Sequence, residues 1–151
     1  MALWKFLHLL GVAIFLGNNL ITPFWKAMAD RNRDSRVVAF AQRMVSLTDK
    51  IFTITGVTLL AMGGYVLAGS QPGMWSQSWL IWGHALFVAS GLLWLFVLIP
   101  LQWKLGRMAR EFADGSPIPD RYWSLNRMWS LVGSLSSLLP LVALWWMVVK
   151  G

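Results

Sequence analysis

Two histidines, His8 and His84, are the side chains of this sequence best suited to metal chemistry, and they are its only histidines. Each lies near the start of a long apolar segment. Two imidazoles that meet across a helical bundle can hold a haem iron axially, or a copper ion. The alternative is that each ring only donates a hydrogen bond between helices. Ionisable groups inside membrane segments are often functional, so both interpretations stay open.

The segment around the first histidine has a polar and small face. Its members are His8, Gly11, Phe15, Asn18 and Thr22. They recur at steps of three and four residues, which places them on one side of a helix. Lipid offers no partner to the Asn18 amide, so this face should look into the bundle. A glycine opposite a ring would let a flat cofactor approach closely, which makes Gly11 and Asn18 candidate cofactor-binding residues beside the two histidines. The alternative role of Gly11 is close packing of helices.

Methionines and one acid add further candidates. Met62, Met74 and Met147 could supply thioether ligands to Cu(I), although apolar filling is the ordinary role of methionine. Asp49-Lys50 precedes an apolar segment, where the pair is either a solvated ion pair or a proton-handling acid. We expect no acidic residue within the hydrocarbon core, which disfavours proton-coupled transport.

Several classes of chemistry are excluded. The chain has no cysteine, so it cannot form disulfides, thiolate metal sites, iron–sulfur clusters or covalently attached haem. No paired-carboxylate, Ser-His-Asp, phosphate-loop or zinc-protease signature is present. The sequence therefore names no catalytic residue and leaves open whether the protein is an enzyme.

The elements that must position these residues are membrane-spanning helices. The sequence is 57% hydrophobic and only 13% charged, whereas a soluble domain has about 25% charged residues. An apolar run of about 20 residues can cross the hydrocarbon core as a helix. The expected spans are Leu3–Phe24, Ile51–Ala68, Trp79–Leu101 and Met128–Val149. The sequence thus predicts an all-α four-helix transmembrane bundle that forms one domain over residues 1–151.

The second helix should begin well before its span, because apolar residues recur at helical spacing ahead of it. These residues are Val37, Phe40, Met44 and Leu47.

Basic residues indicate the orientation. They lie between the first two spans and between the last two, while residues 69–78 have none. The first group is Lys26, Arg31, Arg33, Arg36, Arg43 and Lys50, and the second is Lys104, Arg107, Arg110, Arg121 and Arg127. Short basic loops stay in the cytoplasm. We therefore expect a multi-pass protein of the bacterial inner membrane with both termini outside. Anionic lipid headgroups, not nucleic acid, explain the net charge of +7.

The two halves of the chain, about 1–70 and 77–151, resemble each other. Each reads His, Pro, Trp-Lys and then Arg-Met-x-Ser-Leu, so that His8 corresponds to His84 and Pro23 to Pro100. With two spans per half, both halves run the same way across the membrane, as in parallel repeats related by an axis along the membrane normal. The pattern favours two helical-hairpin repeats that place the histidines at equal depth near the outer surface. The alternative is chance similarity between apolar helices.

The opening Trp4-Lys5-Phe6-Leu7-His8-Leu9-Leu10-Gly11, the four spans and the length resemble a bacterial family of predicted integral membrane proteins. That family looks related to the HemJ-type protoporphyrinogen oxidases and the CopD-type copper-resistance proteins, which also open with a helical histidine. The downstream motifs of the HemJ type are not matched here, which leaves that activity unsupported. The resemblance implies handling of b-type haem or copper in the outer half of the bundle.

Three functions follow as hypotheses. The first is a haem b membrane protein with His8 and His84 as axial ligands, which serves electron transfer or porphyrin-related redox chemistry. The second is a copper-binding protein that uses the same histidines and methionines. The third is an accessory subunit of a larger membrane complex with structural histidines. The expected partners are the lipid bilayer and a membrane redox partner, a larger complex or a second copy of the chain.

Overall fold

A computed structural model describes residues 1–149, and within that range every regular element is a helix. The first half contains α1 (Ala2–Asn32), α2 (Ser35–Thr48), the π-helix η1 (Asp49–Thr53) and α3 (Ile54–Gly69). The second half contains the 3₁₀ turn η2 (Met74–Ser76), α4 (Ser78–Leu93), the π-helix η3 (Trp94–Leu98), α5 (Ile99–Glu111) and α6 (Asp120–Val149). The predicted all-α architecture is confirmed.

Four continuous helices are long and apolar enough to cross a membrane, which confirms the four predicted spans. Two of them, Ser35–Gly69 and Ser78–Glu111, contain 35 and 34 residues. At a rise of about 1.5 Å per residue each is about 50 Å long, whereas the hydrocarbon core is about 30 Å thick. The second and third helices therefore extend well beyond the bilayer core.

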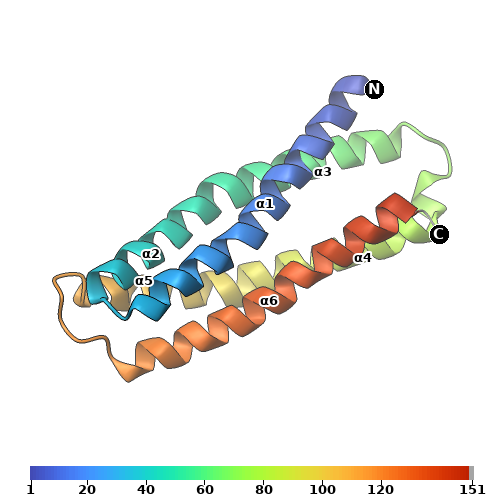
Figure 1. Cartoon of the computed structure of the whole chain (residues 1–151). Coiled ribbons are helices and arrows are strands. Elements are labelled where there is room, and N and C mark those ends of the chain that lie inside the picture. Colours follow the sequence, from blue (N-terminus) through green and yellow to red (C-terminus); the bar gives the residue numbers. More distant parts are fainter. Residues whose placement is uncertain (150–151) are drawn as a thin grey trace.

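The helices form two hairpins that lie side by side (Figure 1). α1 packs mainly against α3, and α4 packs mainly against α6. The start of α1, the end of α6 and η2 lie at one end of the bundle, which we call the terminal end. The opposite end carries the α1–α2 turn and the α5–α6 loop, and we call it the basic end. Toward the terminal end α1 diverges from α6 (Figure 1), so the two hairpins separate there.

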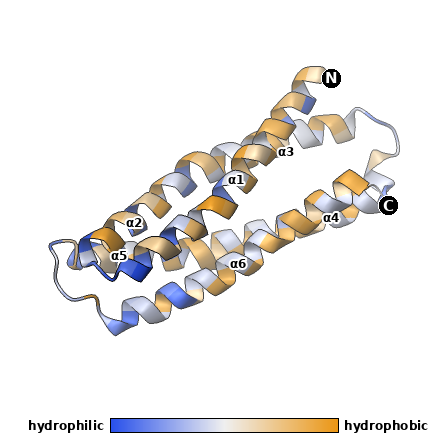
Figure 2. Cartoon of the chain, viewed as in Figure 1, coloured by the Kyte–Doolittle hydropathy of each residue, from blue (hydrophilic) through white to orange (hydrophobic). Residues whose placement is uncertain are grey.

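The hydrophobic core lies at the basic end. Its buried side chains come from α2, η3, α5, the residue that follows α5, and α6, and hydrophilic residues gather around the same end (Figure 2). The core consists of Val38, Ala39, Val45, Leu98, Leu101, Leu105, Ala109, Phe112, Tyr122 and Trp129. The bundle is therefore tightly packed where it is charged outside and more open at the terminal end.

The apolar residues that indicated the early start of α2 are mostly not the ones that it buries. The early start of this helix is confirmed, but Val37, Phe40 and Leu47 remain exposed. The side chains that α2 buries include Val38 and Val45, which belong to the core shared with α5. Because α2 lies beyond the bilayer core, we expect its exposed apolar side chains to contact the lipid headgroup layer.

The π-helices η1 and η3 interrupt the two longest helices at matching places. α3 and α4 each contain 16 residues, so both π-helices lie equally far from the turn that joins these helices. A π-helix commonly arises where one extra residue is accommodated within an α-helix, and it is frequent at functional sites. The two π-helices fall in the second and third spans, not at equivalent positions of the two halves. The proposed duplication stays a prediction.

The start of α1 and the end of α6 lie at the same end of the bundle, and the side of the membrane that this end faces stays a prediction. Because the chain lacks cysteine, single cysteines can report on each end. We expect Gln71→Cys to react with a membrane-impermeant maleimide on intact cells, and Ser116→Cys to react only after permeabilisation. The opposite labelling pattern would reverse the orientation.

Candidate functional site

A cavity of about 440 Å³ lies between the two hairpins at the terminal end. Its volume falls in the range of about 300–1,000 Å³ that is usual for ligand sites. Both His8 and His84 line it, together with aromatic side chains such as Tyr65 and Trp75. The structure thus brings the two predicted histidines to one shared space.

The hydrogen bond of His8 determines which of its ring nitrogens carries the proton. Its Nδ1 lies 2.8 Å from the backbone oxygen of Leu60 on α3. A carbonyl oxygen only accepts, so Nδ1 carries the proton and a neutral ring keeps its lone pair on Nε2. Metal-binding histidines are commonly oriented by such a bond on the other ring nitrogen. Gly64 makes room for this ring, because a Cβ at position 64 would lie 3.1 Å from Nδ1.

His84 lies in an aromatic corner. Its Nε2 is 3.4 Å from the hydroxyl oxygen of Tyr65. The rings of Tyr65 and Trp75 meet the imidazole edge-on, with centroids 5.6 and 6.2 Å away. The two histidines therefore have different partners: a backbone carbonyl for His8 and a phenol for His84.

Gly11 serves the contact between α1 and α3. A Cβ at this position would lie 2.3 Å from the backbone nitrogen of Leu60 and 2.7 Å from the backbone oxygen of Gly56. Gly63 mirrors it on α3, where a Cβ would lie 2.7 Å from the backbone oxygen of Trp4. These glycines let the two helix backbones approach closely, which is the packing role weighed for Gly11 in the sequence.

The chain matches the family of predicted integral membrane proteins termed DUF2269 over residues 2–151. It belongs to this family. No curated protein and no solved structure matches it. The further likeness of this DUF2269 chain to the HemJ and CopD types stays a prediction.

Asn18 lies away from the histidines of this DUF2269 protein, beside a second cavity of about 240 Å³. Its Nδ2 donates to Asp49 Oδ1 and to Thr53 Oγ1, both at 3.0 Å. Gln102 Nε2 donates to Asp49 Oδ2 at 2.5 Å. The Asp49 carboxylate thus joins the first three spans through neutral donors.

The sequence offered Asp49 either as half of a solvated pair with Lys50 or as a proton-handling acid. In the structure its carboxylate accepts hydrogen bonds from amides and a hydroxyl of the bundle. Asp49 lies in the long helix Ser35–Gly69, ahead of the Ile51–Ala68 span, so the absence of acids from the hydrocarbon core stays a prediction. The π-helix η1, which begins at Asp49, had no signal in the pattern of apolar residues.

The methionines of this DUF2269 chain separate into two environments. Met74 and Met147 line the histidine cavity. Met62 is 51% exposed on the outside of α3, so it is poorly placed as a ligand. The copper hypothesis therefore depends on the first two.

A buried ionic network connects α1 and α6 at the basic end. Lys26 is only 1% exposed, and its Nζ contacts Asp30 Oδ1 at 2.5 Å and Asn126 Oδ1 at 3.2 Å. Asn126 Nδ2 in turn donates to Asp30 Oδ2 at 2.9 Å. The sequence placed Lys26 among the basic loop residues, but the structure uses it to bind the end of α1 to α6.

Tyr65, Gly64 and Gln102 are the site residues that the sequence analysis missed. Each acquires its role from a partner on another helix, as with Gln102 and Asp49, which are 53 positions apart. The spacing of residues along one helix carries no signal for such contacts.

Proposed function

We propose that this membrane protein holds haem b between its two hairpins, with His8 and His84 as axial ligands, for electron transfer or porphyrin-related redox chemistry. One observation carries the proposal. The bond from His8 Nδ1 to the Leu60 carbonyl leaves Nε2 with the free lone pair, and His8 and His84 line the same cavity.

The residues around the cavity fit a flat hydrophobic group. Aromatic side chains and Gly64 surround the space, and an apolar ring gains free energy when it leaves water or lipid headgroups for such a site. His84 would exchange its 3.4 Å contact with Tyr65 for a metal bond. The Tyr65 hydroxyl would then be free to donate to a polar group at the edge of the ring.

The ligand set favours a prosthetic group over a bare ion. Among residues 1–149 no three His, Asp or Glu side chains gather into a metal-binding group. Two imidazoles are too few for a typical zinc site. They suffice for a porphyrin iron, because the macrocycle supplies the four equatorial nitrogens. Haem would supply one-electron chemistry, and the protein would hold it, orient it and limit the access of water.

Copper is the second candidate, and two methionines in the cavity lining support it. Met74 and Met147 accompany both histidines there, and imidazole with thioether ligands suits Cu(I). The third candidate is an accessory subunit. The hydrogen bonds of both histidines would then be purely structural contacts between helices.

The absorption spectrum of the detergent-solubilised protein tests the proposal. We expect a Soret band and redox-sensitive visible bands in the wild type. His8→Ala and His84→Ala should each abolish or shift these bands, because each removes an axial ligand. Met62→Leu is the matched control, since Met62 faces away from the cavity, and it should leave the spectrum unchanged.

The other outcomes select among the candidates. If the purified protein contains copper and no haem, and both His8→Ala and Met147→Leu lose that copper, copper is the bound group and the haem proposal is wrong. If the purified protein contains neither haem nor copper and is unstable outside a larger complex, the accessory-subunit hypothesis is supported. An unaltered haem spectrum in His8→Ala would remove His8 from the ligand set.

A further inference from the structure

A groove of about 300 Å³ runs between α2 and α5 at the basic end, away from both cavities described above. Its floor is made of small residues, among them Ala39, Gly106 and Ala109. A Cβ at position 106 would meet nothing within 4 Å, so the space above Gly106 is open. The groove is therefore a recess in the surface, formed because small side chains meet where the two helices pack.

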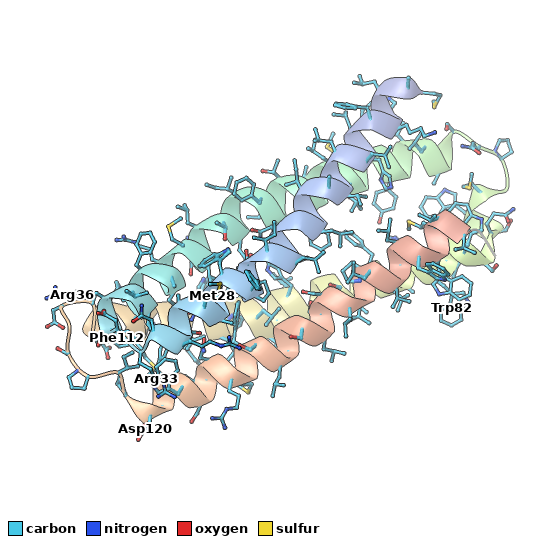
Figure 3. The ribbon with its side chains drawn as sticks, viewed as in Figure 1. Met28, Arg33, Arg36, Trp82, Phe112 and Asp120 are labelled. Atoms are coloured by element: carbon cyan, nitrogen blue, oxygen red, sulfur yellow. The ribbon has the colours of Figure 1, made fainter. Side chains whose placement is uncertain are left out.

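Arginines surround this recess. Arg36 and Arg43 reach it from α2 and Arg110 reaches it from α5. Within the described residues no carboxylate lines the groove. Arg36 donates to the backbone oxygen of Asp114 at 3.1 Å, which holds its guanidinium at the rim. Figure 3 shows Arg36 at the basic end of the bundle, near the α5–α6 loop. Three guanidinium groups around a small recess form a strong attraction for a phosphate, which guanidinium can bind through paired hydrogen bonds.

The outer surface beside the groove is apolar. Phe40 lines the groove and is 55% exposed, and Leu47 follows on the same helix with 45% exposed. The guanidinium of Arg43 lies 5.5 Å from the centroid of the Phe40 ring. A site for a free phosphate has no need of exposed apolar side chains. A phospholipid presents a phosphate next to acyl chains and matches both features.

The depth of the groove agrees with this match. η1 and α3 together have the length of about 20 residues that crosses the hydrocarbon core. Ser46 and Arg43 follow within the next two helical turns, where the headgroup layer begins. Basic pockets between membrane helices are known to bind anionic lipid headgroups.

We propose that the α2–α5 groove binds one anionic phospholipid, with its phosphate among Arg36, Arg43 and Arg110 and its glycerol group and the first methylenes of its acyl chains against Phe40 and Leu47. The proposal is independent of the histidine cavity. It assigns a defined site to a lipid, beyond the general attraction between basic loops and an anionic membrane.

Native mass spectrometry of the purified full chain tests the site by titration with dioleoylphosphatidylglycerol and with dioleoylphosphatidylcholine. We expect at least tenfold tighter binding of the first bound phosphatidylglycerol than of phosphatidylcholine. Gly106→Leu should remove this preference without a change in net charge, because the new side chain fills the recess. Leu is also a better helix former than Gly, so the variant should fold.

Charge variants separate a site from a general field. Arg43→Gln with Arg110→Gln should lower phosphatidylglycerol binding at least tenfold. Arg107→Gln with Arg121→Gln removes the same charge from exposed positions outside the groove and should lower it less than twofold. Equal losses in the two pairs, retained preference in Gly106→Leu, or equal binding of the two lipids would overturn the proposal. Displacement of the lipid by millimolar inorganic phosphate would make the groove an anion site and would also overturn it.

Discussion

Gly11→Ala is expected to destabilise the bundle by about 2–3 kcal/mol, the upper part of the range for overpacked interiors. One methyl group at this position would lie 2.3 Å from the backbone nitrogen of Leu60, which cannot move without shifting α3. The same displacement would disturb the Leu60 carbonyl that orients His8. The substitution should therefore reduce both the stability of the protein and the binding of the proposed haem in the histidine cavity.

Gly17→Ala is the matched control in the same helix, because its Cβ would meet nothing within 4 Å. It should be neutral or stabilise the protein by up to about 1 kcal/mol, since Ala favours a helix over Gly. Unfolding of the detergent-solubilised protein by a denaturing detergent gives both free energies. Equal stability of the two variants would show that α1 and α3 do not pack as closely as described.

Asp30→Asn is expected to cost about 3–5 kcal/mol, as when one partner of a buried ion pair is removed. Lys26 is 1% exposed, and Asp30 provides its carboxylate contact. Its loss leaves an ammonium group inside the contact between α1 and α6 with only neutral partners, such as Asn126. Because this network lies at the tightly packed end, its loss should weaken the whole bundle.

The double variant Lys26→Met with Asp30→Asn provides the test of mechanism. It removes the buried charge together with its partner, so it should recover much of the stability that Asp30→Asn loses. Thermal unfolding of the wild type, both single variants and the double variant completes the cycle. If the double variant is destabilised by the sum of the two single effects, the pair is not coupled and the ionic interpretation is wrong.

The four spans could be predicted because hydropathy is a local property. The run from Trp79 to Leu101 is apolar whatever it packs against, and the structure gives the helix Ser78–Glu111 there. The ends of the helices could not be predicted from hydropathy, because the second and third helices continue beyond the bilayer core as amphipathic segments. α2 shows the difficulty: Val37, Phe40 and Leu47 formed the visible apolar pattern, yet they stay outside.

The candidate site was predictable only in part. The histidines could be chosen because an imidazole in a membrane segment needs a partner, and both line one cavity. The helical face that joined Asn18 to His8 did not predict a common site, because α1 meets different neighbours along its length. His8 meets the backbone of α3, while Asn18 meets Asp49 in the π-helix η1. Lys26 was assigned to the loop because a lone charge is costly inside a membrane and Lys26 follows the first span. The analysis did not pair it with Asp30, which lies one helical turn away.

The π-helices η1 and η3 also affect how the two long helices can change through evolution. In a regular α-helix each residue advances by about 100°, so the face that meets lipid fixes the face that emerges beyond the bilayer. An extra residue within a π-helix adds one such step and changes which face emerges beyond the bilayer. α3 thus presents its glycines to α1 while α2, in the same continuous helix, turns Val38 and Val45 toward α5. Loss of one residue at η1 would rotate α2 by about 100° relative to α3 and turn Val38 and Val45 away from α5.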